Sequence, residues 1–144
     1  MNVTETFPVL VLEFNEVFQV KRSLEHLKTF YLLERPQNKL SRILIIDSNG
    51  SEFRFSNLSK IRFSGFKWSG AIPLPLVHID VTTVPTGEVW QLSDVKKCWF
   101  DWGRWKLFVE TAIGADEIES AVKSANSFEE FFAAIRDFFD GPQL

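Results

Sequence analysis

The sequence predicts an α+β domain, in which an antiparallel, hairpin-rich sheet is packed by C-terminal helices to give two layers. Alternating strand-like runs separated by turn residues fill most of the chain, and helical periodicity follows at its end. The 144 residues are 45% apolar and include 15 Phe and 5 Trp against a single Tyr, which is typical of a large aromatic core. No repeat, low-complexity run or linker divides the chain, so we expect one domain over residues 1–144.

The first third of the chain predicts a strand and then a helix. The apolar run over 7–14 is short enough for a buried strand, and Pro8 restricts the start of that strand to an edge or a first residue. Ser23 is suited to cap a helix that ends before Pro36. Residues 29–33 would serve equally well as a strand, and that alternative stays open.

An Asn-Gly dipeptide at 49–50 lies between two apolar runs and predicts a hairpin with a type I′ turn. With these two residues as the loop, Ile46 pairs with Phe53 on the core face. The same register places Asp47 opposite Glu52, which is unfavourable unless a cation or a basic side chain lies nearby. A bound cation and an ordinary solvated pair both remain open.

The next strands carry one candidate catalytic pair. Gly65 interrupts an alternating run and predicts a strand with a bulge or a bend. Residues 77–84 alternate again until Pro85 and Gly87, after which a further strand is expected. His78 and Asp80 share the polar face, as a general base and its orienting carboxylate would in a hydrolase. A solvent-facing polar row is the commoner role for such residues.

Two structures are open for the basic, tryptophan-rich stretch after Ser93. A hairpin with its loop at 101–103 would place Trp99 opposite Trp105, and we favour this interpretation. The alternative is a short helix that Ser93 caps and Gly103 ends, followed by a strand.

Aromatic side chains beside cations in this stretch suggest a ligand platform. Exposed rings would stack on single-stranded nucleic acid bases or on sugar rings. Burial in the core or as cross-strand cladding is the commoner role, and the residue that burial explains least is Trp102, at the predicted loop tip. The candidate platform residues are Trp99, Trp102, Arg104 and Trp105.

The end of the chain predicts two helices. Asp116 opens the first, and Asn126 ends it. Ser127 caps the second, with Glu130 reaching back in a capping box. The inward residues of the first helix are Ile118, Ala121 and Val122. The apolar stripe of the second comprises Phe128, Phe131, Phe132, Ile135, Phe138 and Phe139.

Charge and composition exclude several function classes. The net charge of −3 argues against a dedicated nucleic-acid coat. Residues 1–109 carry 14 basic and 11 acidic side chains, whereas residues 110–144 carry 2 basic and 8 acidic. One Cys and two His provide neither a disulfide nor a zinc-binding pattern, so we expect no metal and no cofactor. The pKa of Cys98 would be lowered by Lys96 and Lys97, although a buried, inert thiol is commoner.

No catalytic motif is present. The chain lacks the GxxxxGK(S/T), GxGxxG, GxSxG and HExxH patterns, and we therefore expect that it is not an enzyme. The N-terminus has no basic region followed by a small-residue cleavage site, and no apolar run reaches the roughly 18 residues of a membrane span. We expect a cytoplasmic protein that does not associate with membranes.

The acidic helix pair at 114–132, GADEIESAVKSANSFEEFF, follows a hairpin-rich sheet. This plan resembles the small single-domain immunity proteins of bacterial polymorphic-toxin systems. The resemblance implies a non-catalytic protein that binds a cognate toxin domain and blocks its active site. An acidic surface suits a basic toxin partner. The predicted partner-binding residues are Asp116, Glu117, Glu119, Glu129, Glu130, Asp137 and Asp140.

Overall fold

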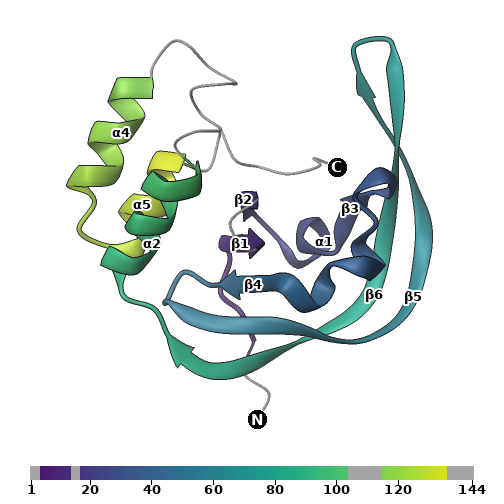
Figure 1. The fold of residues 1–144 in the computed structure, drawn as a ribbon, viewed down its shortest axis with the longest axis horizontal. Helices are drawn as coiled ribbons and strands as arrows, with labels where there is room; N and C mark the ends of the chain where they lie inside the picture. Colours follow the sequence, from purple (N-terminus) through teal and green to yellow (C-terminus); the bar gives the residue numbers. More distant parts are fainter. Residues whose placement is uncertain (1–3, 14–16, 104–114, 136–144) are drawn as a thin grey trace.

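The computed structural model describes residues 4–13, 17–103 and 115–135, and it confirms an α+β fold (Figure 1). In chain order, the strands are β1 (Val9–Glu13), β2 (Val17–Lys21), β3 (Thr29–Tyr31), β4 (Ile43–Ile46), β5 (Ser51–Ser69) and β6 (Ile72–Val89). The helices are α1 (Leu24–Leu27), α2 (Leu92–Cys98), α4 (Ala115–Ser124) and α5 (Phe128–Ile135). Short 3-10 turns occupy 32–34, 36–38 and 40–42. None of these described helices is long and apolar enough to cross a membrane.

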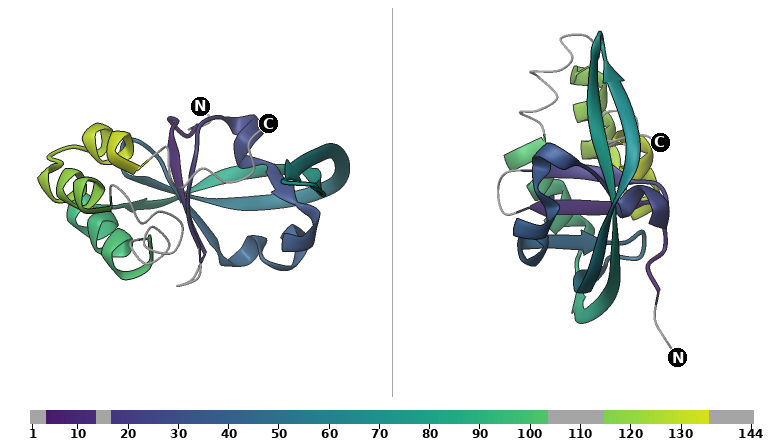
Figure 2. Two further views of the ribbon diagram at one scale, coloured as in Figure 1. Left: turned by 90° about the horizontal axis from the view of Figure 1, so that it is seen from above. Right: turned by 90° about the vertical axis from the view of Figure 1, so that its right-hand side faces the viewer.

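The six strands form one curled sheet in the order β2-β1-β4-β5-β6-β3, and neighbouring strands are antiparallel. β5 and β6 form a long twisted hairpin, and its far end projects beyond the other strands (Figure 2). The helices α2, α4 and α5 lie together at the opposite end of the molecule (Figure 1).

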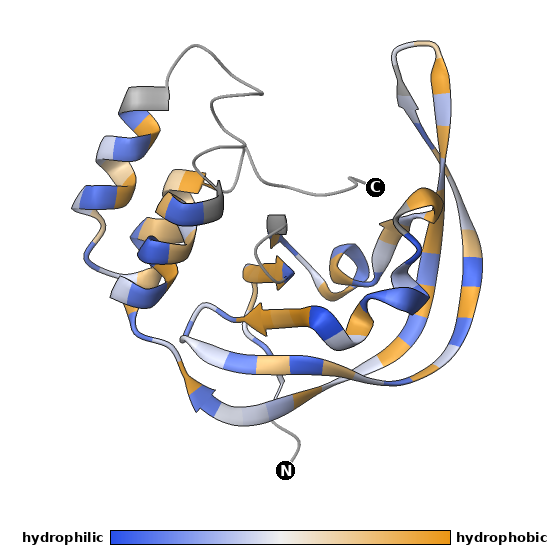
Figure 3. Cartoon of the chain, in the orientation of Figure 1, coloured by the Kyte–Doolittle hydropathy of each residue, from blue (hydrophilic) through white to orange (hydrophobic). Residues whose placement is uncertain are grey.

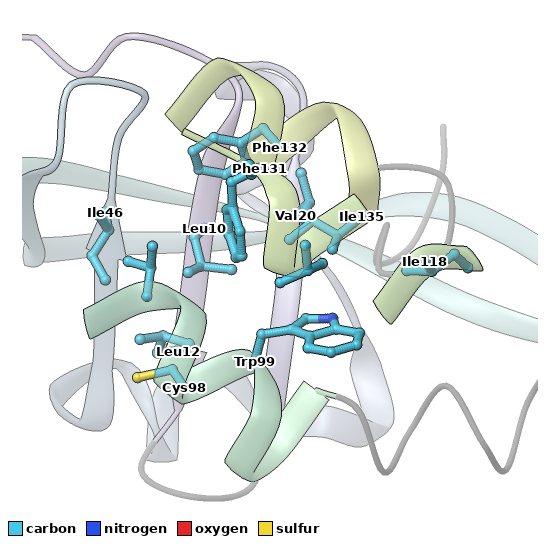
Figure 4. Close-up of a cluster of buried hydrophobic side chains, with 13 residues drawn as sticks. Leu10, Leu12, Val20, Ile46, Cys98, Trp99, Ile118, Phe131, Phe132 and Ile135 are labelled. Atoms are coloured by element: carbon cyan, nitrogen blue, oxygen red, sulfur yellow. The ribbon is translucent and has the colours of Figure 1, made fainter. Parts of the chain in front are cut away.

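Strand β1 separates two hydrophobic cores. Leu10 and Leu12 face the helices and pack with α2, α4 and α5 in what we call the helix-side core (Figure 4). Val9 and Val11 point the other way, into an inner core that the curled sheet and α1 enclose. All five residues of β1 are buried. This two-sided burial explains why the strand appears in the sequence as a continuous apolar run rather than an alternating one.

The predicted register of the 49–50 hairpin is wrong by one residue. The loop has three residues, because the Asp47 N–H donates to the Ser51 carbonyl at 3.0 Å and Gly50 adopts a φ of +84°. A left-handed third residue is the usual end of a three-residue hairpin loop. Phe53 is therefore opposite Ile45 instead of Ile46, and both lie in the inner core.

The helix predicted after Ser23 is only four residues long. The Ser23 hydroxyl accepts the His26 N–H at 3.1 Å and caps α1 as expected. The prediction that the helix ends only before Pro36 is wrong, because Thr29–Tyr31 pairs with β6 and satisfies its backbone groups there. The strand alternative for this segment is therefore the structure found.

Pro85 and Gly87 do not end the strand over 77–84, since β6 continues to Val89. In the described part of the chain, the outer edge of β6 pairs with β3 only at 76–78. A proline on an unpaired edge removes no ladder hydrogen bond, so the strand continues through it. The bulge predicted at Gly65 is confirmed by a register shift against β6.

The favoured hairpin with a loop at 101–103 is also wrong. α2 continues into a π-helical turn, Trp99–Gly103, so the helix alternative is closer to the structure. The N-cap is Gln91 rather than Ser93, and its N–H donates to the Asp94 carboxylate at 3.1 Å. Helical spacing buries three side chains of this segment in the helix-side core: Val95, Cys98 and Trp99.

The two C-terminal helices lie where the periodicity predicts them. The Ser127 hydroxyl accepts the Glu130 N–H at 3.1 Å, and the Glu130 carboxylate accepts the Asn126 N–H at 2.6 Å. Ala121 is exposed, contrary to expectation. Five of the residues predicted to face inward are buried as expected: Ile118, Val122, Phe131, Phe132 and Ile135. Phe138 and Phe139 lie outside the described residues.

Candidate functional site

The acidic residues predicted to bind a partner are divided between two helices. Asp116, Glu117 and Glu119 belong to α4, and Glu129 and Glu130 to the first turn of α5. Glu119 lies 3.4 Å from the Lys123 ammonium, and the Glu130 carboxylate is part of the α5 cap. Glu117 and Glu129 are exposed. Asp137 and Asp140 lie outside the described residues.

The tryptophan platform is not supported at its first residue. Trp99 has no exposed surface and packs edge-to-face on Phe100, with ring centroids 4.9 Å apart. A fully buried indole cannot stack on a ligand in solvent, so the expectation for Trp99 is wrong. Trp102 belongs to the π-helical turn, but its side chain lies outside the description, as do Arg104 and Trp105.

His78 and Asp80 share a face of β6 as predicted, but each has a different partner. The His78 Nε2 lies 3.9 Å from the Asp80 carboxylate, beyond hydrogen-bond distance. The Asp80 carboxylate instead accepts a hydrogen bond from the Arg62 guanidinium at 3.1 Å. The imidazole Nδ1 lies 3.6 Å from the exposed Glu25 carboxylate. This arrangement is a row of polar side chains along the sheet, with an ion pair between Arg62 and Asp80.

Asp47 and Glu52 are satisfied separately by hydrogen bonds. The buried Asp47 carboxylate accepts backbone N–H groups at 2.9 to 3.1 Å from Asn49, Ser51 and Thr6. The Glu52 carboxylate accepts the Trp90 indole N–H at 3.0 Å and the Thr86 hydroxyl at 2.6 Å. Among the described residues, no group of three or more His, Cys, Asp or Glu could hold a metal ion.

Glu52 forms one wall of a pocket of about 500 Å³, which we call the α2 pocket. The pocket lies where the end of β6 meets α2 and the π-helical turn. Among the described residues, four carboxylates and one ammonium line it, so this part of its wall carries a net negative charge. The lining residues are Glu52, Glu88, Val89, Trp90, Asp94, Lys97, Cys98 and Asp101.

Helical spacing and a close backbone contact build this pocket. Asp94, Lys97 and Asp101 are three and four residues apart, which places them on one face of the helical segment. The Trp90 N–H donates to the Gly50 carbonyl at 2.7 Å and fixes the corner between β6 and α2. A Cβ on Gly50 would lie 2.7 Å from the Trp90 carbonyl oxygen and 3.0 Å from the Phe128 ring, so this approach requires glycine.

The pocket environment makes the single cysteine unreactive. Burial, followed by the negative charges of Asp101 and Asp94, raises the pKa of Cys98 to about 11. The thiol is therefore neutral at physiological pH, contrary to the lowering that its lysine neighbours suggest. Lys97 does lower the pKa, but its effect is the smallest of the four.

A second surface is the projecting end of the β5–β6 hairpin, residues 63–75, which we call the arm. Phe63, Phe66 and Trp68 are 63%, 58% and 66% exposed on it. Figure 3 shows hydrophobic and hydrophilic residues mixed along both arm strands. A small apolar pocket of about 250 Å³ at the arm base is lined by Tyr31, Leu33, Leu74 and Pro75. The sequence already indicated this surface, because Phe and Trp alternate with cations along the arm. The aromatic ligand platform was nevertheless predicted only at residues 99–105.

No known protein family matches the chain, and neither a curated protein nor a solved structure is similar to it.

Proposed function

We propose that the chain is a non-catalytic protein-binding domain, an immunity-type inhibitor that neutralises a toxin, and that the α2 pocket receives a basic side chain of that partner. The observation that carries the proposal is the set of four carboxylates and one lysine that the described residues contribute to the cavity wall. Such a cavity attracts cationic groups, accelerates encounter with a basic protein and repels acidic ones.

The pocket chemistry suits a guanidinium or an ammonium group. Asp94 and Asp101 are exposed at the pocket rim, where they can meet an arriving cation. Glu52 is held in place by the Trp90 indole and the Thr86 hydroxyl, so ordering it costs little conformational entropy on binding. The half-buried Trp90 side chain supplies an aromatic surface beside the carboxylates, which favours a delocalised cation.

A non-catalytic role agrees with the state of the nucleophile and base candidates. A thiol with a pKa of about 11 is a poor nucleophile at neutral pH. The His78–Asp80 separation of 3.9 Å leaves the imidazole without an orienting carboxylate at hydrogen-bond distance.

The test is binding and neutralisation of the product of a toxin-like neighbouring gene, measured by calorimetry and by growth rescue on co-expression. Removing charge at the rim with Glu88→Gln and Asp101→Asn should weaken binding at least about tenfold, mainly through slower association at low salt. Glu25→Gln, at an exposed acidic residue on α1 outside both candidate binding sets, is the matched control and should bind normally. Unchanged affinity in the double variant, or no binding and no rescue with any such product, contradicts the proposal.

A second candidate function, a platform for single-stranded nucleic acid or carbohydrate, has one favourable observation. Residues 53–79 contain four basic and no acidic side chains, and Trp68 is exposed among them. Lys67 alternates with Phe66 and Trp68 along β5, however, so the cation and the rings lie on opposite faces. Quenching of tryptophan fluorescence by oligonucleotides or oligosaccharides, lost in Trp68→Ala, would favour this function.

A further inference from the structure

The arm presents three aromatic side chains on one face. In an uninterrupted strand, Phe63 and Phe66 would point to opposite faces, because they are an odd number of residues apart. The bulge between Phe63 and Gly65 adds one residue and restores a common face. The two rings lie 5.2 Å apart in an edge-to-face contact, and Trp68 follows two residues later on the same face.

This aromatic face continues the surface of the inner core. Phe63 is opposite Val77 in the ladder, and directly opposed residues of an antiparallel pair share a face. Val77 is 4% exposed and belongs to the inner core, whereas Phe63 is 63% exposed. The row of apolar side chains on this face therefore extends beyond the part that other described residues cover.

The arm is also a ribbon of only two strands. In the described part of the chain, β4 pairs with β5 only near residues 52–53, and β3 pairs with β6 only at 76–78. Two strands without a packed face are marginally stable in water, and unpaired edges invite a further chain. A partner that covers the aromatic face would stabilise the arm.

We infer that this partner is a second copy of the chain, bound with the two aromatic faces packed together about a twofold axis. A twofold contact uses the same patch on both subunits, so an exposed aromatic face can pack against the same face of a second copy. Lys67 on the arm and Arg62 just before it alternate with the aromatic residues and point away from such a contact. Face-to-face packing thus buries the rings and keeps the positive charges of the two arms apart.

The available surface is sufficient for a weak dimer. At roughly 60% exposure, each aromatic side chain has on the order of 100 Å² to bury. With the flanking Ile61, Pro73 and Pro75, two copies would bury on the order of 1,000 Å², near the lower limit of specific interfaces. The dissociation constant is therefore expected in the micromolar range.

Analytical ultracentrifugation of the full chain from about 1 to about 500 µM tests the inference. The wild type should change from monomer to dimer across this range, and added salt should preserve or tighten the dimer, because it screens the like-charged arms. Phe66→Ser with Trp68→Ser should weaken association at least about tenfold. Circular dichroism should show an unchanged fold, because both side chains are largely exposed.

Ile72→Ser is the matched control. Ile72 is 63% exposed near the same tip, but the ladder places it on the opposite face of the ribbon, so the dimer should persist. A monomer at every concentration, or equal weakening by Ile72→Ser, overturns the inference. Salt-sensitive binding of a single-stranded oligonucleotide to this face of a monomer would also overturn it. The α2 pocket uses none of these residues, so failure here leaves the proposed function intact.

Discussion

The two ends of the β-sheet use similar strand chemistry with opposite results. At β1, every side chain is buried because the helices cover one face and the curled sheet covers the other. On the arm, large aromatic side chains remain about 60% exposed because no described element lies over them. Whether an apolar strand is buried in a core or exposed as a contact surface thus depends on the layers that surround it. The sequence of the strand alone does not determine the outcome.

The largest expected difference between the two regions is in core packing. Phe131→Ala removes a fully buried ring from the helix-side core and should lower the free energy of unfolding by about 3–5 kcal/mol. Phe66→Ala on the arm should change it by about 0.5 kcal/mol or less at monomeric concentrations. Urea unfolding of both variants measures the contrast, and comparable losses would show that the arm face is packed in solution.

Two glycines provide a backbone version of the same comparison. Gly50→Ala combines a φ of +84° with contacts of 2.7 and 3.0 Å, and should cost about 2–4 kcal/mol. Gly70→Ala, at a φ of +62° with nothing within 4 Å, should cost only about 1–2 kcal/mol. Thermal unfolding of the two variants separates the cost of the close contacts from the cost of the positive φ. Equal losses of unfolding free energy would indicate that the corner beside Trp90 relaxes without cost.

A smaller effect is expected at the start of α5. Ser127→Ala removes the acceptor for the Glu130 N–H and should destabilise the protein by about 1 kcal/mol. Ser124→Ala, which removes a hydroxyl bound to the Ser120 carbonyl at an exposed position of α4, should be close to neutral. Denaturant midpoints for the two serine variants distinguish a cap from a surface hydroxyl, and a neutral Ser127→Ala would show that the capping box contributes nothing.

A further, pH-dependent effect is expected at Cys98. Because the pKa of Cys98 is raised from its ordinary value of 9.0 to about 11 in the folded state, the thiol contributes full stability below pH 9 and loses it as pH rises towards 11. Stability should therefore fall more in the wild type than in Cys98→Ala between these pH values.

A Cys introduced on the arm by Trp68→Cys should react with a thiol reagent at pH 8 much faster than Cys98 does. Equal reaction rates would contradict the buried environment of Cys98.

Local signals predicted much of the fold. Ser23 and Ser127 mark helix starts because a capping hydroxyl acts within three residues. Gly65 marks the bulge for a similarly local reason. The hairpin register differs from the prediction because the Asp47 carboxylate accepts the N–H groups of Asn49 and Ser51 and so stabilises a three-residue loop. The same carboxylate accepts the N–H of Thr6, a contact 41 residues away that no local pattern contains. Trp99 was misassigned because its burial depends on helices that follow it in sequence.

The α2 pocket could not be located from the sequence for a related reason. The concentration of acidic residues over 110–144 directed attention to α4 and α5. The carboxylates of the pocket come instead from residues 1–109, where basic side chains outnumber acidic ones. They belong to Glu52, Glu88, Asp94 and Asp101. The net charge of a sequence segment combines residues that the fold places far apart. A cluster of like charges can therefore be recognised only from the positions of the side chains in the structure.

The position of β1 between two cores has a consequence for folding cooperativity. Leu10 and Val11 are neighbours in sequence, yet their side chains belong to different cores. Loss of the helical layer would expose one side of β1, and loss of the curled hairpin would expose the other, so neither half retains a fully buried strand alone. The backbone amides of β1 should therefore exchange with solvent only through global unfolding, and the two cores should melt as one unit.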